Sequence, residues 1–309
     1  MKTNRFPAKR SKSSGFTLIE LLVAMSITVV LIGVLVYLTA ISMDTYRDSR
    51  NEVRASRQAK EALETIAKDL ESMVSRRDGN TYEWLYAGEE GFSNMGPSGK
   101  EITNTSQLIF FTGATDRYNG QIGVNGVDNG GDVSCVSYRL VYRDQIGDTN
   151  DDKFAVFSFY RHLVDPDDAF ELLAVNDLES AYSTKFNDGD ALTANNFLVE
   201  NIYEFTLTFL VEYTPSGSNT TKIERVSLRQ NGKDNYTEFR LKGNKIQATG
   251  PGAGVIAIEN GVIVGAEVSI TVLTDRGITL AKNVSPEIWE RERKKHSYHY
   301  TKTITTPRP

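Results

Sequence analysis

The chain has 309 residues, of which 39% are hydrophobic and 24% charged, an ordinary balance for a globular protein. Its net charge is −5, and because the first 15 residues contribute +5, the remainder carries −10, which argues against a general nucleic-acid groove. Cys135 is the single cysteine, so an intramolecular disulfide is excluded and any domain in an oxidising space is held by its core alone.

The N-terminus combines a basic leader with a long uncharged segment. Residues 21–43 form a run of 23 residues without a formal charge. As a helix this run would cover roughly 34 Å, enough for a hydrocarbon core of about 30 Å. No acidic residue occurs before Gly15, and the leader contains five basic ones: Lys2, Arg5, Lys9, Arg10 and Lys12. This asymmetry predicts that residues 16–43 form a transmembrane helix segment, with a cytoplasmic N-terminus and the bulk of the chain exported.

Two residues beside this segment are unusual for an ordinary signal or anchor. Glu20 lies at the edge of the apolar run, where a carboxylate is costly unless it has a partner. In a secretory signal the small residue at the cleavage site follows the apolar region. Here Gly15 precedes it, so cleavage after Gly15 would remove only the leader and leave a chain that begins at Phe16.

The stretch Gly15-Phe16-Thr17-Leu18-Ile19-Glu20 resembles the prepilin peptidase recognition motif of type IV pilins and type II secretion pseudopilins. The resemblance implies cleavage between Gly15 and Phe16, methylation of the new amino terminus at Phe16, and pairing of Glu20 with the N-terminal amine of a neighbouring subunit during assembly. It further implies four partners: the prepilin peptidase, other pilins or pseudopilins through the N-terminal helix, an inner-membrane assembly platform and the lipid bilayer.

Residues 44–78 are predicted to continue the same helix in amphipathic form. No glycine or proline interrupts the chain between Gly33 and Gly79, and Asp78-Gly79-Asn80 predicts the helix end. Apolar residues recur at intervals of three and four, as on the core-facing side of a helix: Ala59, Ala62, Leu63, Ile66, Leu70 and Met73.

Residues 79–285 are predicted to form a β-rich exported domain. Leu108–Phe111 has the pattern of a buried strand, residues 136–143 and 154–161 of a hairpin, and 204–213 of a half-buried strand. Val268–Val272 is expected as the last core strand, and Ile223–Leu228 is expected to pair with Tyr236–Leu241 around Asn231-Gly232. A helix followed by antiparallel strands predicts an α+β fold.

Several stretches are predicted to be loop insertions or irregular. Residues 82–105, 113–132 and 173–196 are rich in small and polar residues. Residues 286–309 form a basic C-terminal tail that ends Pro307-Arg308-Pro309 and is expected to fray.

The subtype is indicated by weaker similarities. The segments 67–71, 198–202 and 267–268 look like those of a J-type minor pseudopilin of type II secretion. The three insertions depart from a compact J-type domain and leave room for a PilW-like minor pilin of a type IV pilus.

No set of residues predicts catalysis. Asp148, Asn150 and Asp152 match the first ligands of a calcium loop, but Lys153 and Phe159 replace its glycine and glutamate, so a hydrated turn is favoured. Calcium stays possible because some pseudopilins bind it. The acidic group after His162, formed by Asp165, Asp167 and Asp168, does not predict a metal site, and neither does the pair His296 and His299. The glycine-rich stretch 250–254 is expected to be a turn, and Cys135 is expected to be a buried inert thiol.

The sequence therefore predicts a non-catalytic minor pseudopilin of the bacterial inner membrane, with a periplasmic C-terminal domain, later extracted into a filament. A minor pilin is the alternative within the same class. A membrane-anchored periplasmic binding or hydrolytic domain is the alternative from a different class.

Overall fold

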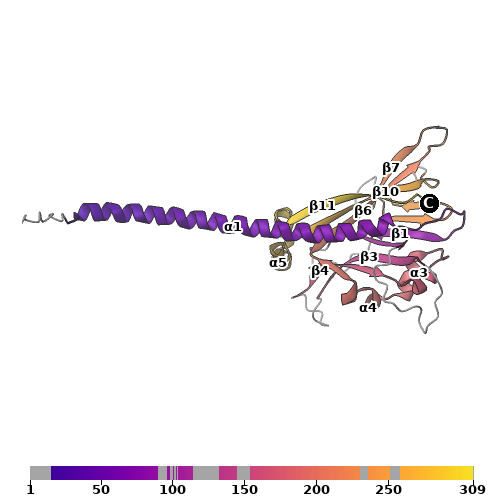
Figure 1. Cartoon of the computed structure of the whole chain (residues 1–309), viewed down its shortest axis with the longest axis horizontal. Helices are drawn as coiled ribbons and strands as arrows, with labels where there is room; N and C mark the ends of the chain where they lie inside the picture. Colours follow the sequence, from indigo (N-terminus) through magenta and orange to yellow (C-terminus); the bar gives the residue numbers. More distant parts are fainter. Residues whose placement is uncertain are drawn as a thin grey trace, which may run out of the picture. The chain divides into compact units, whose positions relative to one another are not determined.

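The computed structural model describes residues 15–89, 96–97, 100, 102, 104–113, 132–144, 154–229, 236–250 and 258–308. The chain divides into two compact units, with the boundary between Arg50 and Asn51. The N-terminal unit is helical in the residues described. The C-terminal unit contains two antiparallel sheets and the last part of the same helix (Figure 1).

Helix α1 runs from Leu18 to Glu71. The predicted core-facing stripe is confirmed for its five members inside the helix, which are all buried: Ala59, Ala62, Leu63, Ile66 and Leu70. Met73 is buried too, but it lies beyond the end of the helix. The predicted end at Asp78–Asn80 is wrong, since the helix stops at Glu71. The backbone N–H of Val74 donates to the carbonyl of Phe111 at 2.8 Å, and the N–H of Gly113 donates to the carbonyl of Ser72 at 3.0 Å. The residues after Glu71 therefore pair with the strand that contains Phe111, and this pairing ends the helix before Asp78–Asn80.

The strands form a seven-stranded and a four-stranded sheet, and all neighbours within each sheet are antiparallel. The order of the larger sheet is β5 (Phe197–Glu200), β4 (Val156–Leu163), β3 (Ser134–Arg143), β2 (Ser106–Thr112), β1 (Glu83–Glu89), β8 (Glu238–Lys242) and β9 (Ile246–Thr249). The order of the smaller sheet is β11 (Ser297–Thr305), β10 (Val262–Leu273), β6 (Ile202–Tyr213) and β7 (Lys222–Ser227). The α+β prediction is confirmed, as is the hairpin of β3 with β4.

The two sheets meet through aromatic side chains. The rings of Phe159 in β4 and Phe205 in β6 have centroids 4.9 Å apart, and those of Phe209 in β6 and Phe239 in β8 are 4.3 Å apart. Arg161, two residues after Phe159 on the same face of β4, bonds to Asp69 of α1. One face of the larger sheet is thus covered by both α1 and the smaller sheet.

The opposite face of the larger sheet lies beneath a helical insertion between β4 and β5. It contains α2 (Pro166–Phe170), α3 (Leu178–Lys185), α4 (Asp188–Ala191) and a 3-10 turn at Ala194–Asn196 (Figure 1). The prediction of an irregular loop at 173–196 is wrong. Asp177 accepts a hydrogen bond from the N–H of Ser180 and Asn187 from that of Gly189, so the polar residues that suggested a loop are helix N-caps.

Residues 82–105 are also not a loop throughout, because β1 occupies Glu83–Glu89 inside the larger sheet, between β2 and β8. Trp84, Leu85, Tyr86 and Ala87 are all buried. A strand covered on both faces has a continuous apolar run and no alternation, which leaves only a short signal beside glycine-rich sequence.

The predicted pairing of Ile223–Leu228 with Tyr236–Leu241 is wrong. β7 pairs with β6, whereas β8 pairs with β1 and β9, and the two segments share a single parallel bridge between Leu228 and Tyr236. The turn at Pro215–Ser218, in which Gly217 has φ +80°, closes the β6–β7 hairpin over a short loop. The loop of the predicted hairpin, 229–235, would be about as long as the observed loop, 214–221, so closure entropy does not decide between the two partners. Pairing with β6 instead buries Val226 opposite Phe209.

The prediction of a frayed tail is wrong as well. After α5 (Asp275–Asn283), α6 (Pro286–Glu292) and a 3-10 turn at Arg293–Lys295, strand β11 pairs with β10 over nine consecutive residue pairs from Gly265–Thr305 to Leu273–Ser297. Val268–Val272 is accordingly not the last strand. Residues 298, 300, 302 and 304 alternate with exposed neighbours, a period of two that the basic residues nearby obscured.

Substitution of Ile304 tests whether this strand contributes to folding. Ile304 is 2% exposed, so Ile304→Val is expected to lower the free energy of unfolding by about 0.5–1.5 kcal/mol. Ile223→Val in β7 is the matched control, because Ile223 is 61% exposed and should show almost no change. Chemical denaturation of the two variants measures the difference, and equal values would indicate that β11 does not pack as described.

A buried polar centre joins α1 to the larger sheet. Asp69 is 0% exposed; Arg161 donates to its two carboxylate oxygens at 2.7 and 2.8 Å, and the Tyr138 hydroxyl donates at 2.5 Å. Burial and the neighbouring carboxylate raise the pKa of Tyr138 well above its ordinary value, which keeps the hydroxyl a donor. These directional bonds fix both the rotation and the axial position of the helix on the sheet.

Candidate functional site: the N-terminal helix start

Helix α1 begins with a capping box formed by Thr17 and Glu20. The Thr17 N–H and hydroxyl both bond to Glu20 Oε2, at 2.8 and 2.9 Å, and the Glu20 N–H donates back to Thr17 Oγ1 at 3.3 Å. Each residue thereby satisfies a backbone donor that the first turn of a helix leaves unpaired. Sequence reasoning had singled out Glu20 and missed Thr17. The signal was present in the four residues Thr17-Leu18-Ile19-Glu20, which fit the S/T-x-x-E pattern.

The predicted cleavage point lies just outside this helix. Gly15, Phe16 and Thr17 precede its first residue, and the Phe16 side chain is 89% exposed. The peptide bond between Gly15 and Phe16 is therefore not held by helical hydrogen bonds. Among the described residues, nothing lies within 4 Å of a Cβ added at Gly15, so this part of the chain makes no steric demand for glycine there.

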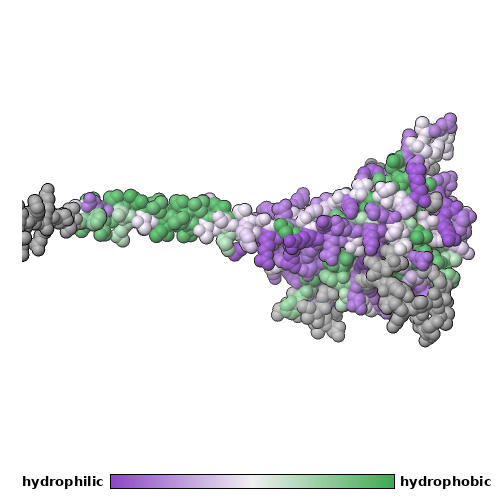
Figure 2. All heavy atoms as spheres, in the orientation of Figure 1, coloured by the Kyte–Doolittle hydropathy of each residue, from purple (hydrophilic) through white to green (hydrophobic). Residues whose placement is uncertain are grey.

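The helix that follows has an apolar surface exposed on every side. Residues 18–50 are all exposed, and apolar side chains cover the visible face of the first part of α1 (Figure 2). Within the uncharged run, Ser26, Thr28 and Thr39 each donate their hydroxyl to the carbonyl four residues earlier, at 2.8–2.9 Å. These hydroxyls need no water, as required inside a bilayer. Among the described residues, α1 is the one helix long and apolar enough to cross a membrane.

Glu20 shares one face of the helix with apolar residues. Val23, Ala24 and Ile27 follow it by three, four and seven positions and line a shallow groove with Ile19 and Glu20 itself. Small and branched side chains on one face allow close approach of another helix in lipid. The carboxylate thus lies at the edge of a surface suited to helix packing.

The comparison with protein families agrees with this arrangement. Residues 10–36 match the prokaryotic N-terminal methylation motif. This is a type IV pilin-like prepilin signal. The motif supports a type IV pilin-like protein, either a pilin or a pseudopilin, and implies processing by prepilin peptidase and assembly with other pilins. No curated protein and no solved structure matches the chain.

The prepilin signal includes the three residues singled out from sequence. Gly15, Phe16 and Glu20 all fall within the matched span of 10–36. The apolar helix that follows fits a membrane anchor of the pilin type.

The other candidates from sequence do not gather into a second site. Among the residues the structure describes, no group of three or more His, Cys, Asp or Glu side chains is placed to hold a metal ion. Asp165, Asp167 and Asp168 lie at the start of α2, and Lys185 pairs with Asp168 at 3.2 Å. His299 lies in β11 and bonds to Thr271, whereas His296 ends the preceding 3-10 turn. The calcium-like stretch 148–152 and the turn at 251–254 lie outside the described residues.

Cys135 is buried in β3, as predicted, with 0% exposure. Burial raises the pKa of its thiol, which disfavours the reactive thiolate. This residue therefore packs as a small apolar side chain.

One acidic cluster of the C-terminal unit surrounds an arginine. Arg240, 15% exposed at its side chain, bonds to Glu83 and Asp177 at 3.1 Å, to Glu179 at 3.0 Å and to Glu238 at 2.6 Å. Burial raises the pKa of Glu83, against the opposing effects of the Leu178 N–H and Arg240. The cluster joins β1 and β8 to α3, and its carboxylates already share a cation.

Proposed function

We propose that the protein is a minor pseudopilin, a non-catalytic structural subunit at the tip of a type II secretion pseudopilus. The observation that carries this proposal is the continuity of α1. One helix holds the prepilin signal at its start, an apolar span in its middle and the core of the C-terminal unit at its end. Membrane insertion, assembly and attachment to a folded domain then use successive parts of a single element.

The proposed location is the inner membrane of a Gram-negative-type bacterium. The basic leader favours a cytoplasmic N-terminus, and a single membrane crossing then leaves the C-terminal unit in the periplasm. Assembly would extract α1 from the bilayer and pack its exposed apolar surface against the helices of neighbouring subunits. The exported unit is then carried by α1 and fixed to it by the buried centre at Asp69.

In this proposal Glu20 has two successive roles. Both Thr17 bonds go to Oε2, whereas Oε1 has no hydrogen-bond partner within the described part of the chain. Oε1 is therefore open to the charged N-terminal amine of Phe16 on a neighbouring subunit. The free energy of placing a charged carboxylate and a charged amine in lipid is lower when the two form an ion pair than when each is alone. The pairing therefore fixes the register of adjacent helices.

A minor pilin of a type IV pilus is the second candidate. It is favoured by the insertion between β4 and β5, which folds into three helices and enlarges the C-terminal unit beyond a compact pseudopilin domain. The genes beside this one would separate the candidates. A secretion ATPase with further pseudopilins would support the first, and a retraction ATPase with pilus genes the second.

Mass spectrometry of the purified protein tests the shared part of both candidates. In cells that hold the peptidase, the mature chain is expected to begin with methylated Phe16 and to lack residues 1–15. In cells without the peptidase, the leader should remain. An intact leader in both strains would exclude processing as a pilin and would favour an anchored binding or hydrolytic domain.

A further inference from the structure

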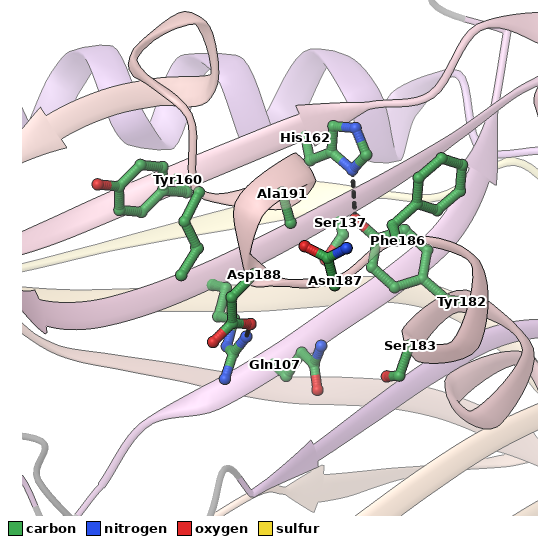
Figure 3. Close-up of a pocket in the computed structure, with 12 residues that line it drawn as sticks. Gln107, Ser137, Tyr160, His162, Tyr182, Ser183, Phe186, Asn187, Asp188 and Ala191 are labelled. Atoms are coloured by element: carbon green, nitrogen blue, oxygen red, sulfur yellow. Dashed lines mark hydrogen bonds and ion pairs between the residues drawn. The ribbon is translucent and has the colours of Figure 1, made fainter.

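A cavity of about 280 Å³ lies on the side of the C-terminal unit away from α1 (Figure 3). Its floor is the outer face of the larger sheet, where Ser137 pairs with His162 and Arg139 with Tyr160 across β3 and β4. Its walls come from α3, α4 and the residues between them. The cavity therefore exists because the insertion between β4 and β5 folds back over the sheet.

The charged groups around this cavity are already compensated. Arg139 Nη1 lies 2.5 Å from Asp188 Oδ1. His162 Nδ1 and the Tyr182 hydroxyl are hydrogen-bonded at 2.5 Å, and Figure 3 shows this bond at one end of the cavity. Because the one arginine is paired with the one aspartate, the cavity offers no net charge to an anion or a cation.

Several neutral polar groups, in contrast, are open. Among the described residues, the side-chain amide of Gln107 and the hydroxyl of Ser183 have no hydrogen-bond partner. Asn187 accepts the Gly189 N–H through Oδ1 at 2.7 Å, which leaves its Nδ2 group without a protein partner in the described part of the chain. Two amides and a hydroxyl provide both donors and acceptors, the complement of a neutral ligand with several hydroxyl groups.

The remaining lining supplies apolar surface beside these groups. The half-buried ring of Phe186, with Ala191 and Leu192, borders the cavity. A pyranose ring has an apolar C–H face that suits contact with an aromatic ring and a polar edge that needs hydrogen bonds. At about 30 Å³ per water molecule, 280 Å³ corresponds to about nine waters, enough for one pyranose unit.

We propose that this cavity binds a single neutral pyranose unit of a saccharide, with Gln107, Ser183 and Asn187 contacting its hydroxyls and Phe186 its apolar face. The site belongs to the C-terminal unit alone and holds for either candidate filament.

Saturation-transfer NMR on the full chain in lauryldimethylamine oxide micelles, which contain no sugar, tests the proposal. The probes are the methyl glycosides of glucose, galactose, mannose and N-acetylglucosamine. At least one is expected to bind. Gln107→Leu and Ser183→Ala each remove one hydrogen-bonding group, so each should weaken binding of that probe about 2- to 12-fold.

Gln247→Leu in β9 is the matched control, since Gln247 lies outside the cavity and its loss should leave binding unchanged. Ser183 is exposed, so its alanine variant should fold even if Gln107→Leu does not. The absence of binding by all four probes to the unmodified chain would overturn the proposal. Binding that is equally strong in Ser183→Ala and Gln247→Leu, and in Gln107→Leu where that variant folds, would also overturn it, because the sugar would then occupy another surface.

Discussion

Replacement of Asp69 by alanine is expected to lower the free energy of unfolding of the C-terminal unit by about 3–5 kcal/mol. This loss of stability comes from the polar groups that stay buried after the carboxylate is removed. Arg161, 4% exposed, would keep its charge without the carboxylate that accepts its two hydrogen bonds, and the buried Tyr138 hydroxyl would lose its acceptor. Denaturant unfolding of the full chain in micelles, followed by the near-ultraviolet signal of the sheet aromatics, measures the loss.

A surface pair provides the matched control. Arg139 and Asp188 form the same kind of contact at 2.5 Å, but the Asp188 side chain is 71% exposed. Asp188→Ala should therefore cost about 0–1 kcal/mol. Equal losses from the two aspartate variants would contradict the special position of Asp69.

A triple variant distinguishes removal of the whole buried polar centre from removal of the Asp69 carboxylate alone. Asp69→Leu, Arg161→Met and Tyr138→Phe together remove all three polar groups and leave apolar side chains of similar size. This variant is expected to be much more stable than Asp69→Ala, because no uncompensated buried charge remains. If it is stable but the position of α1 on the sheet becomes less defined, the polar centre serves register more than stability.

Much of this fold was predictable because it follows from local patterns. The intervals of three and four in α1 reflect an element with one buried face, and that prediction is confirmed. Strand β6 forms where the alternation predicts a strand, but Thr206 and Thr208 are buried as well, so it is not half-buried along its whole length. β1 shows the limit of this reasoning. Its residues are buried on both faces, so their position depends on both neighbouring strands, β2 and β8, and β8 lies more than 140 residues later in the sequence.

The corrected elements share this dependence on distant partners. α1 ends at Glu71 because Val74 pairs with Phe111, and β11 is ordered because β10 offers a free edge. Neither partner, Phe111 for the end of α1 or β10 for β11, can be identified from the residues adjacent to the element in the sequence. The start of α1 is the opposite case, since Thr17 and Glu20 are three residues apart and their capping box was readable from sequence.

The processing site was predictable for a different reason. The prepilin signal is a linear motif, so the residue types and spacing within residues 10–36 are themselves the signal. The roles of Gly15, Phe16 and Glu20 within this motif stay predictions. The cavity at Gln107 and Ser183 could not be predicted, because these two residues lie 76 positions apart (183 − 107 = 76) and the sequence does not show that α3 packs over β2.

Glu20→Ala is expected to reduce incorporation of the mature protein into filaments about 10- to 150-fold. A hydrogen bond to a charged group contributes about 1.5–3 kcal/mol, and that range converts to this factor. The C-terminal unit should unfold at the same denaturant concentration as before, because Glu20 lies in the other unit. Quantitative recovery of the protein with sheared filaments measures incorporation, and the membrane-bound pool measures expression.

The alanine variant alone does not distinguish pairing with a neighbour from capping of the chain's own helix, because it removes the Thr17 bonds as well. Glu20→Gln separates the two. Glutamine at this position still completes a capping box with Thr17 but carries no charge to neutralise an amine. If Glu20 pairs with the neighbouring N-terminus, glutamine should fail in assembly almost as severely as alanine. If Glu20 acts only as a cap for its own helix, the Glu20→Gln variant should assemble normally. Thr17→Ala should then show the assembly defect instead, since loss of such a cap costs about 0.5–2 kcal/mol.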